Sequence, residues 1–126
     1  KGLKPLAKIL AYSSNSQQRA EFTMAPVGAI EKVLSKTGWN AQEVDLWEIN
    51  EAFAMVTMCP IDDFKLDPAK VNINGGACAL GHPVGSTGSR IILTLIHALK
   101  RTGGKKGIAA LCIGGGEATA VAIELL

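Results

Sequence analysis

The stretch GIAALCIGGGEATAVAIELL, residues 107–126, contains two apolar runs separated by a short glycine-rich turn. Runs of this length and composition predict two buried strands, 107–113 and 118–126. The turn is too short for a crossover connection, so the two strands are expected to be antiparallel neighbours. Upstream of this hairpin the chain alternates predicted strands and helices. This order indicates a layered α/β domain with a mixed sheet covered by helices.

The other expected elements are separated by proline, glycine and polar residues. Asn40 and Glu43 have the spacing of a capping box for a short helical turn. In chain order we predict a strand over 6–15, a helix from Pro26 to the stop at Gly38, a strand over 44–49, a helix over 50–58 that Pro60 ends, and a helix over 86–101 stopped at Gly103.

Composition limits the possible functions. Of the 126 residues, 48% are hydrophobic and 19% charged, which favours one folded domain, 1–126, over a disordered chain. The net charge of +2 and the low aromatic content do not indicate a nucleic-acid partner. No apolar run is long enough to span a membrane. Three widely spaced cysteines give neither a disulfide framework nor a metal motif, so we expect a reducing compartment, the cytoplasm.

The glycine-rich loop NGGACALGHPVGSTGSR, residues 74–90, allows two interpretations. Glycines ahead of a helix are typical of a phosphate cradle, and the glycine spacing here matches a P-loop. However, the Lys and Ser/Thr of that motif are replaced by His82 and Pro83. Gly81 lets the backbone take a turn closed to other residues, and Pro83 fixes the next φ angle, so together they would aim the His82 imidazole in one direction. His82 is therefore either a catalytic base or a histidine on a surface turn.

Two further residues are candidates on their own chemistry. Cys112 ends an apolar strand just before Gly114, where bare backbone N–H groups could bind a developing oxyanion; the alternative is a small buried hydrophobe. Asn50 lies between a strand and a helix, where its amide could position a water or a carbonyl; the alternative is an N-cap. Four other residues are expected to be structural or at the surface: Cys59, Cys78, His97 and Trp47.

Three segments taken together resemble the C-terminal motifs of the thiolase family. They are NEAFA (50–54), NINGGACALGHPVGSTGSR (72–90) and LCIGGGEATAVAIE (111–124), in this order. The resemblance covers essentially the whole chain and is greatest with the biosynthetic branch of the family. It implies the C-terminal domain of an acyltransferase that condenses two acetyl-CoA into acetoacetyl-CoA and coenzyme A, reversibly. It also implies that no metal or redox cofactor is needed. The acyl-CoA thioesters are substrates and not cofactors.

The resemblance implies a role for each candidate. His82 would deprotonate a nucleophilic cysteine, and with a water held by Asn50 it would form one oxyanion hole. Cys112 would exchange a proton with the α carbon of acetyl-CoA, with the Gly114 N–H serving a second oxyanion hole. Ala52 and Phe53 would line the acyl pocket.

Two departures from the family pattern limit these implications. The acylated cysteine belongs to the family's N-terminal half, which this chain lacks, so the chain alone is expected to be inactive without that partner domain. Phe22 and Met24, in FTMAPVGA (22–29), stand where many members have a glycine-richer stretch, which leaves the acyl-chain preference open. Members are usually homo-oligomers. The alternative function is a thiolase-like assembly module without catalysis.

Overall fold

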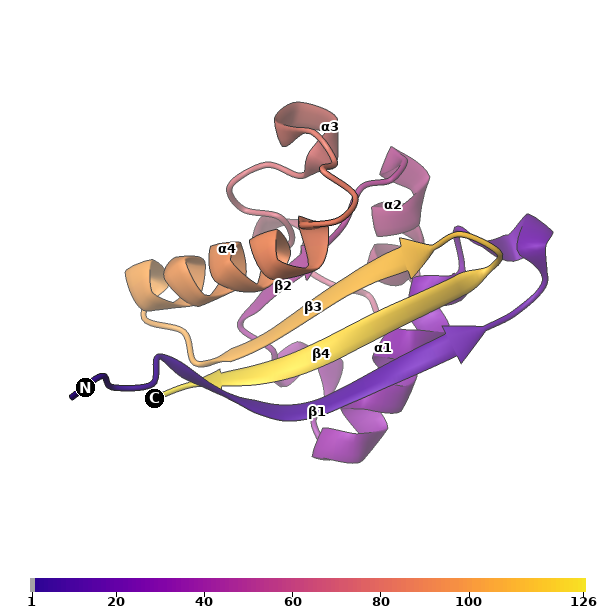
Figure 1. Cartoon of the computed structure of the whole chain (residues 1–126). Coiled ribbons are helices and arrows are strands. Elements are labelled where there is room, and N and C mark those ends of the chain that lie inside the picture. The colour runs from indigo at the N-terminus through magenta and orange to yellow at the C-terminus, as the bar shows by residue number, and fades with distance from the viewer. Residues whose placement is uncertain (1) are drawn as a thin grey trace.

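The computed structural model describes residues 2–126, which contain a four-stranded mixed sheet in the order β1-β4-β3-β2 (Figure 1). β3 and β4 are antiparallel, as predicted, and β2 is parallel to β3. β1 joins the sheet through an antiparallel pairing with β4, the strand most distant from it in sequence. The strands are β1 (Ala7–Ser16), β2 (Leu46–Ile49), β3 (Lys106–Ile113) and β4 (Glu117–Leu125).

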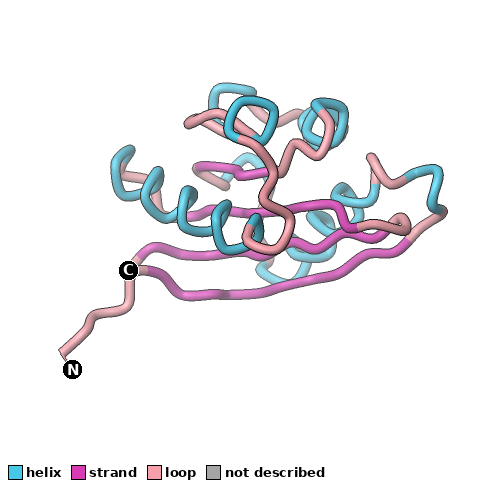
Figure 2. The backbone as a smooth tube through the Cα atoms, turned by 45° about the horizontal axis from the view of Figure 1, so that its top comes forward, coloured by secondary structure: helices cyan, strands magenta, loops and turns pink. Residues whose placement is uncertain are grey.

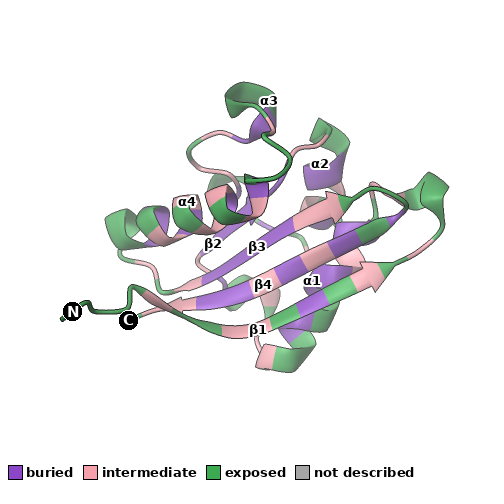
Figure 3. Cartoon of the chain, in the orientation of Figure 1, coloured by how far each residue is buried: buried purple, intermediate pink, exposed green. Residues whose placement is uncertain are grey.

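Helices cover the two faces of the sheet because the strands alternate apolar residues toward each face. On one face, α1 (Ala25–Thr37) packs against Ile108 and Ala110 of β3 and the alanines of β4. On the other, α4 (Thr87–Thr102) packs against Leu46 of β2 and Ala109 of β3. Figure 3 shows buried residues concentrated in the two central strands, while β1 and the outer side of α4 carry exposed residues. The predicted layered α/β architecture is confirmed.

The segment after β2 differs from the prediction. We expected a helix from Asn50 that Pro60 ends, but α2 spans Ala54–Asp63 with Phe53 at its N-cap and Pro60 inside it. Asn50 is therefore not an N-cap. Its N–H donates to the Ala110 carbonyl at 2.9 Å, which continues the pairing with β3 for one more residue and delays the helix. Pro60 removes one helical N–H, yet it is buried, and Phe64 N–H still bonds to its carbonyl at 3.1 Å.

Short helical turns connect the main elements. They are η1 (Arg19–Glu21), η2 (Ala41–Glu43), η3 (Pro68–Lys70) and α3 (Ala77–Leu80), the last of which lies inside the glycine-rich loop (Figure 2). The predicted capping box is present at η2, where Asn40 and Glu43 satisfy each other's backbone. Trp47 is a core residue and His97 is exposed, as predicted.

Candidate active site

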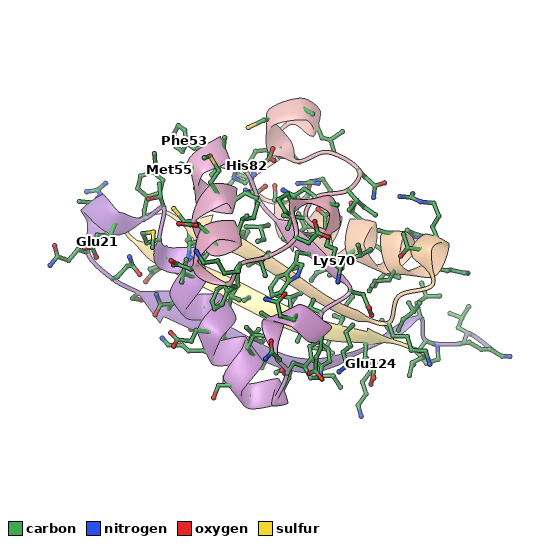
Figure 4. The ribbon with its side chains drawn as sticks, turned by 180° about the vertical axis from the view of Figure 1, so that it is seen from behind. Glu21, Phe53, Met55, Lys70, His82 and Glu124 are labelled. Carbon is green, nitrogen blue, oxygen red and sulfur yellow. The ribbon has the colours of Figure 1, made fainter. Side chains whose placement is uncertain are left out.

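The candidate residues converge where the parallel strands β2 and β3 end. A cavity of about 440 Å³ opens there, lined by Arg19, Phe22, Ala52, His82, Cys112, Ile113, Gly114 and Gly115. Carboxyl ends of parallel strands are where α/β folds place their ligands. Segments more than 90 residues apart in sequence, from Arg19 to Gly115, thus meet at one site. Figure 4 shows His82, Phe53 and Met55 at this end of the molecule, with Glu124 at the other.

His82 is held by the loop that precedes α4. Gly81 has φ +89°, a conformation that favours glycine, and the imidazole Nδ1 lies 2.7 Å from the Thr87 hydroxyl oxygen. Thr87 is fully buried in the first turn of α4. His82 itself is half-buried and lies on a turn between exposed residues, with its ring held by Thr87.

The Thr87 hydroxyl determines which nitrogen of His82 is free. A hydroxyl that donates to the Pro83 carbonyl, 3.2 Å away, is left to accept Nδ1–H of His82, and we assign this tautomer to the imidazole. In the neutral ring Nε2 is then unprotonated. Nε2 lies 3.5 Å from Nδ2 of Asn50, which is a donor. With this tautomer, the basic nitrogen of the imidazole lies on the side of the Asn50 amide.

Asn50 lies behind His82 rather than on the cavity wall. Only 1% of its surface is exposed, and it is absent from the residues that line the cavity. Its amide lies between His82 and Arg90, whose Nη2 is 3.5 Å from Asn50 Oδ1. An oxyanion in the cavity would therefore meet His82 first, with the Asn50 NH2 beside it.

Cys112 and the glycine turn form the opposite wall. Burial raises the pKa of the Cys112 thiol, a shift that hydrogen bonding of the thiol to the residue's own backbone partly offsets. The group is therefore a neutral thiol at pH 7 and exists as a thiolate only after giving its proton to another base. Gly114 lines the cavity, and a Cβ there would meet open space among the described residues.

Some of the remaining predicted residues line the cavity and others do not. Ala52 lines the cavity, whereas Phe53 is 62% exposed and does not. Phe53 instead packs edge-on against Phe22, with ring centroids 5.9 Å apart and an interplanar angle of 66°. Phe22 lines the cavity, but Met24, the other unusual residue, does not. Phe22 and Phe53 thus join the loop after β1 to the start of α2.

Glu51 fills the place that a phosphate would need. Its carboxylate accepts from Cys78 N–H at 3.0 Å at the start of α3, and a Cβ on Gly76 would collide with it. A separate hydrogen bond between the Cys78 side chain and Glu51 raises the pKa of the exposed thiol. A helix start already bonded to a carboxylate does not attract a second anion, so the phosphate-cradle interpretation is wrong.

Sequence reasoning missed the supports beneath the site. Asn72 pairs with both backbone groups of Ile49 at 2.8 Å and so fixes the end of β2. Neither Asn72 nor Thr87 belongs to a spacing that indicates a contact. The only sign in the sequence for Thr87 is its place on the apolar side of the helix, where a hydroxyl needs a partner.

No group of three or more His, Cys, Asp or Glu side chains in residues 2–126 has a geometry that could hold a metal ion. Within the same range, no helix is long and apolar enough to cross a membrane.

Comparisons with known proteins identify the family of the chain. Residues 3–125 match the family model of the thiolase C-terminal domain. The chain is 48% identical to the mouse cytosolic acetyl-CoA acetyltransferase over 97% of its own length and 31% of that protein. The crystal structure of the Bacillus anthracis acetyl-CoA acetyltransferase superposes with a TM-score of 0.95 at 48% identity, covering 99% of this chain and 32% of that one.

A second solved structure, the Ascaris suum Acat5 thiolase in complex with coenzyme A, gives a TM-score of 0.92 at 47% identity, over 98% of this chain and 32% of that one. The chain thus spans about a third of the length of these relatives. With its fold, its three motifs and this likeness, the chain belongs to the thiolase family, as its C-terminal domain.

Proposed function

We propose that this chain is the C-terminal half of a thiolase that interconverts two acetyl-CoA with acetoacetyl-CoA and coenzyme A. The observation that carries the proposal is the meeting of His82 and Cys112 on one cavity, with the Asn50 amide 3.5 Å from His82. The relatives named acetyl-CoA acetyltransferase support the substrate class.

His82 and Cys112 have different roles in the proposed reaction. His82 Nε2 takes the proton of a cysteine thiol from the N-terminal half, and that thiolate attacks the acyl thioester. The departing coenzyme A thiolate takes a proton from Cys112, which becomes a thiolate, while His82 keeps the proton of the N-terminal cysteine. In the condensation, Cys112 as a thiolate removes a proton from the α carbon of a second acetyl-CoA. The resulting enolate attacks the acyl-enzyme and releases the N-terminal cysteine as a thiolate, which takes its proton back from His82.

Charge on the thioester oxygen is stabilised by preorganised donors. A water held by the Asn50 NH2 acts with His82 on one oxygen, and the Gly114 N–H serves the other. Each such donor contributes on the order of 10²–10³ in rate. Ala52 lines the acyl pocket. Phe53 packs against Phe22 and so holds that ring in the wall of the acyl pocket, which narrows the pocket and favours short acyl chains.

The partner in this proposal is the N-terminal half that the longer relatives contain. The complete enzyme would be a homo-oligomer that binds acyl-CoA, without metal, nucleic acid or membrane. The cytoplasm stays a prediction that rests on the three free cysteines.

The test is to supply an N-terminal thiolase half with its cysteine and to follow acetoacetyl-CoA thiolysis. We expect activity only when both parts are present, and losses of 10²-fold or more for His82→Ala and Cys112→Ala. His97→Ala, on the exposed side of α4, is the control and should retain full activity. Activity unchanged by the first two substitutions would contradict the site. Stable association without any thiolysis would indicate the assembly module.

A further inference from the structure

The interface between β2 and α4 contains charged groups that the proposed mechanism does not use. Alternate residues of β2 face α4, so Leu46, Glu48 and the following Asn50 share one side of the strand. Only 2% of the surface of Glu48 is exposed. Arg90, in the first turns of α4, directs its guanidinium into the same interface and reaches Asn50.

The Arg90 guanidinium is poorly satisfied there. Its Nε and Nη1 are buried and have no hydrogen-bond partner among the described residues, and its Nη2 contacts only Asn50 Oδ1, at 3.5 Å. Glu48 lies near enough to Arg90 to interact electrostatically, but it forms no ion pair with Arg90 within 4.0 Å in the described chain. A buried guanidinium with so few partners contributes little to stability, and apolar residues often replace such groups without loss.

The chemistry of the two side chains determines the orientation of the amide. A guanidinium has donors and no acceptor, so only Oδ1 of Asn50 can face Arg90. The NH2 group must then point the other way, toward His82 Nε2 at 3.5 Å. With the opposite orientation, an NH2 would face the cation and the oxygen would face an unprotonated nitrogen, and both contacts are repulsive.

We propose that Arg90 is a positioning residue that fixes the Asn50 amide with its NH2 toward His82 and the cavity. Arg90 acts on a bound thioester only through Asn50, because Arg90 is not among the residues that line the site cavity. The catalytic consequence rests on the proposed function, whereas the orientation of the amide does not.

The kinetic test is a double-mutant cycle in the chain combined with an N-terminal thiolase half. We expect Arg90→Met to lower kcat by about 10- to 100-fold with a much smaller change in KM, since a misaligned donor loses transition-state stabilisation. Arg90→Lys keeps the charge but not the planar fork, and should recover only part of the loss. In an Asn50→Ala background, Arg90→Met should cost less than about 3-fold. Equal losses in both backgrounds would overturn the inference.

A matched control is Arg101→Met on the same helix. Arg101 is exposed and bonds to Asn74 at 2.6 Å, away from Asn50. Rates are to be expressed per active site, titrated by acyl-enzyme formation, so that a loss of folded protein does not lower kcat. A loss for Arg101→Met as large as that for Arg90→Met would assign the effect to helix charge and overturn the inference.

A second measurement is independent of catalysis. In nitrogen-15 NMR spectra of this chain alone, the Asn50 side-chain NH2 is identified by its disappearance in Asn50→Asp. Arg90→Met should shift this resonance and speed its hydrogen exchange at least several-fold, whereas Arg101→Met should leave it unchanged. An unaltered Asn50 resonance in Arg90→Met would overturn the inference. Absence of thiolysis by the unsubstituted pair would contradict only the proposed function.

Discussion

Single hydroxyl and amide groups determine the chemistry available at this site. Thr87 accepts Nδ1–H of His82 and Asn50 faces Nε2, so the imidazole has one tautomer and one direction. An imidazole with a defined free nitrogen can act as a base only on the side where that nitrogen points. Thr87 and Asn50 thus orient the His82 imidazole, although neither of them lines the cavity.

Replacing Thr87 with valine tests this arrangement. Thr87→Val keeps the shape but removes the acceptor for Nδ1–H, so the imidazole should lose its preferred tautomer and kcat should fall about 10-fold or more. Thr87→Ser restores the oxygen and should restore most of the rate. The measurement is thiolysis with the N-terminal half, together with the nitrogen-15 shifts of His82. A valine variant that keeps wild-type shifts would contradict the assignment.

The buried carboxyl of Glu48 is expected to make the stability of the fold depend on pH. Burial raises the pKa of its carboxyl from 4.5 to about 7, against the attraction of Arg90 and with a smaller contribution from Glu51. The folded chain therefore holds a proton between pH 4.5 and 7 that the unfolded chain has released. This contribution to stability is present at low pH and is lost as the pH rises through that window, by up to about 3 kcal/mol.

Glu48→Gln should remove this loss of folding stability at rising pH. We expect the unfolding free energy of the variant, relative to wild type, to be higher at pH 8 than at pH 4.5, as measured by urea unfolding at both values. Glu31→Gln, an exposed residue of α1, is the control and should follow the wild type. A difference that is the same at both pH values would show that the pKa of Glu48 is not raised in the folded chain.

At the scale of elements, the turn between β3 and β4 connects the hairpin to the loop after β1. Gly115 and Gly116 have φ +90° and +89°. A Cβ on Gly116 would lie 2.5 Å from the Gln17 carbonyl oxygen, whereas one on Gly115 would meet open space among the described residues. The Gly116 carbonyl also accepts Gln17 N–H at 3.0 Å. The turn thus holds both the Cys112 wall and the loop that carries Phe22.

Two alanine substitutions separate the energetic cost of a positive φ from the cost of a steric collision with Gln17. Gly115→Ala should cost about 1–2 kcal/mol from its positive φ alone. Gly116→Ala has the same conformational cost and must also displace the Gln17 backbone, so we expect a further loss of about 1–3 kcal/mol. Urea unfolding of both variants measures the difference. Equal stabilities would mean that the loop after β1 moves away freely.

At the scale of the whole molecule, the sheet is covered unequally. α1 packs across β1, β4 and β3, while α4 lies mainly over β2 and β3, which leaves much of β1 and β4 uncovered on that face (Figure 1). Large apolar side chains are also exposed around the site and on α4, among them Phe53, Met55, Met58, Leu80, Val84 and Leu93. Exposed apolar surface of this extent is typical of an interface.

The chain alone should therefore bind a hydrophobic dye such as ANS. We expect dye fluorescence to fall in proportion as an N-terminal thiolase half is titrated in, because this half would cover the apolar surface and α4 would become a central helix. Circular dichroism of the same samples checks that the chain is folded before the partner is added. Weak dye binding by the folded chain would contradict the prediction.

Local patterns were sufficient for most of the elements. The hairpin of β3 and β4 follows from two apolar runs and a glycine turn, and α1 and α4 follow from helical spacing with Gly38 and Gly103 at their ends. The start of α2 could not be predicted, because Asn50 continues the pairing with Ala110, a contact that no local pattern contains. The pairing of β1 with β4 is likewise a contact between the two ends of the chain.

The sequence by itself determined the layered α/β fold and the candidate site residues, because periodicity and glycine placement are local properties and the three motifs are contiguous. Only the tertiary structure decided how those residues act together. Thr87 determines the His82 tautomer, Arg90 faces Asn50 and Glu51 occupies the glycine-rich loop. Each of these contacts depends on distance and direction between separate elements, which packing fixes and residue order alone does not.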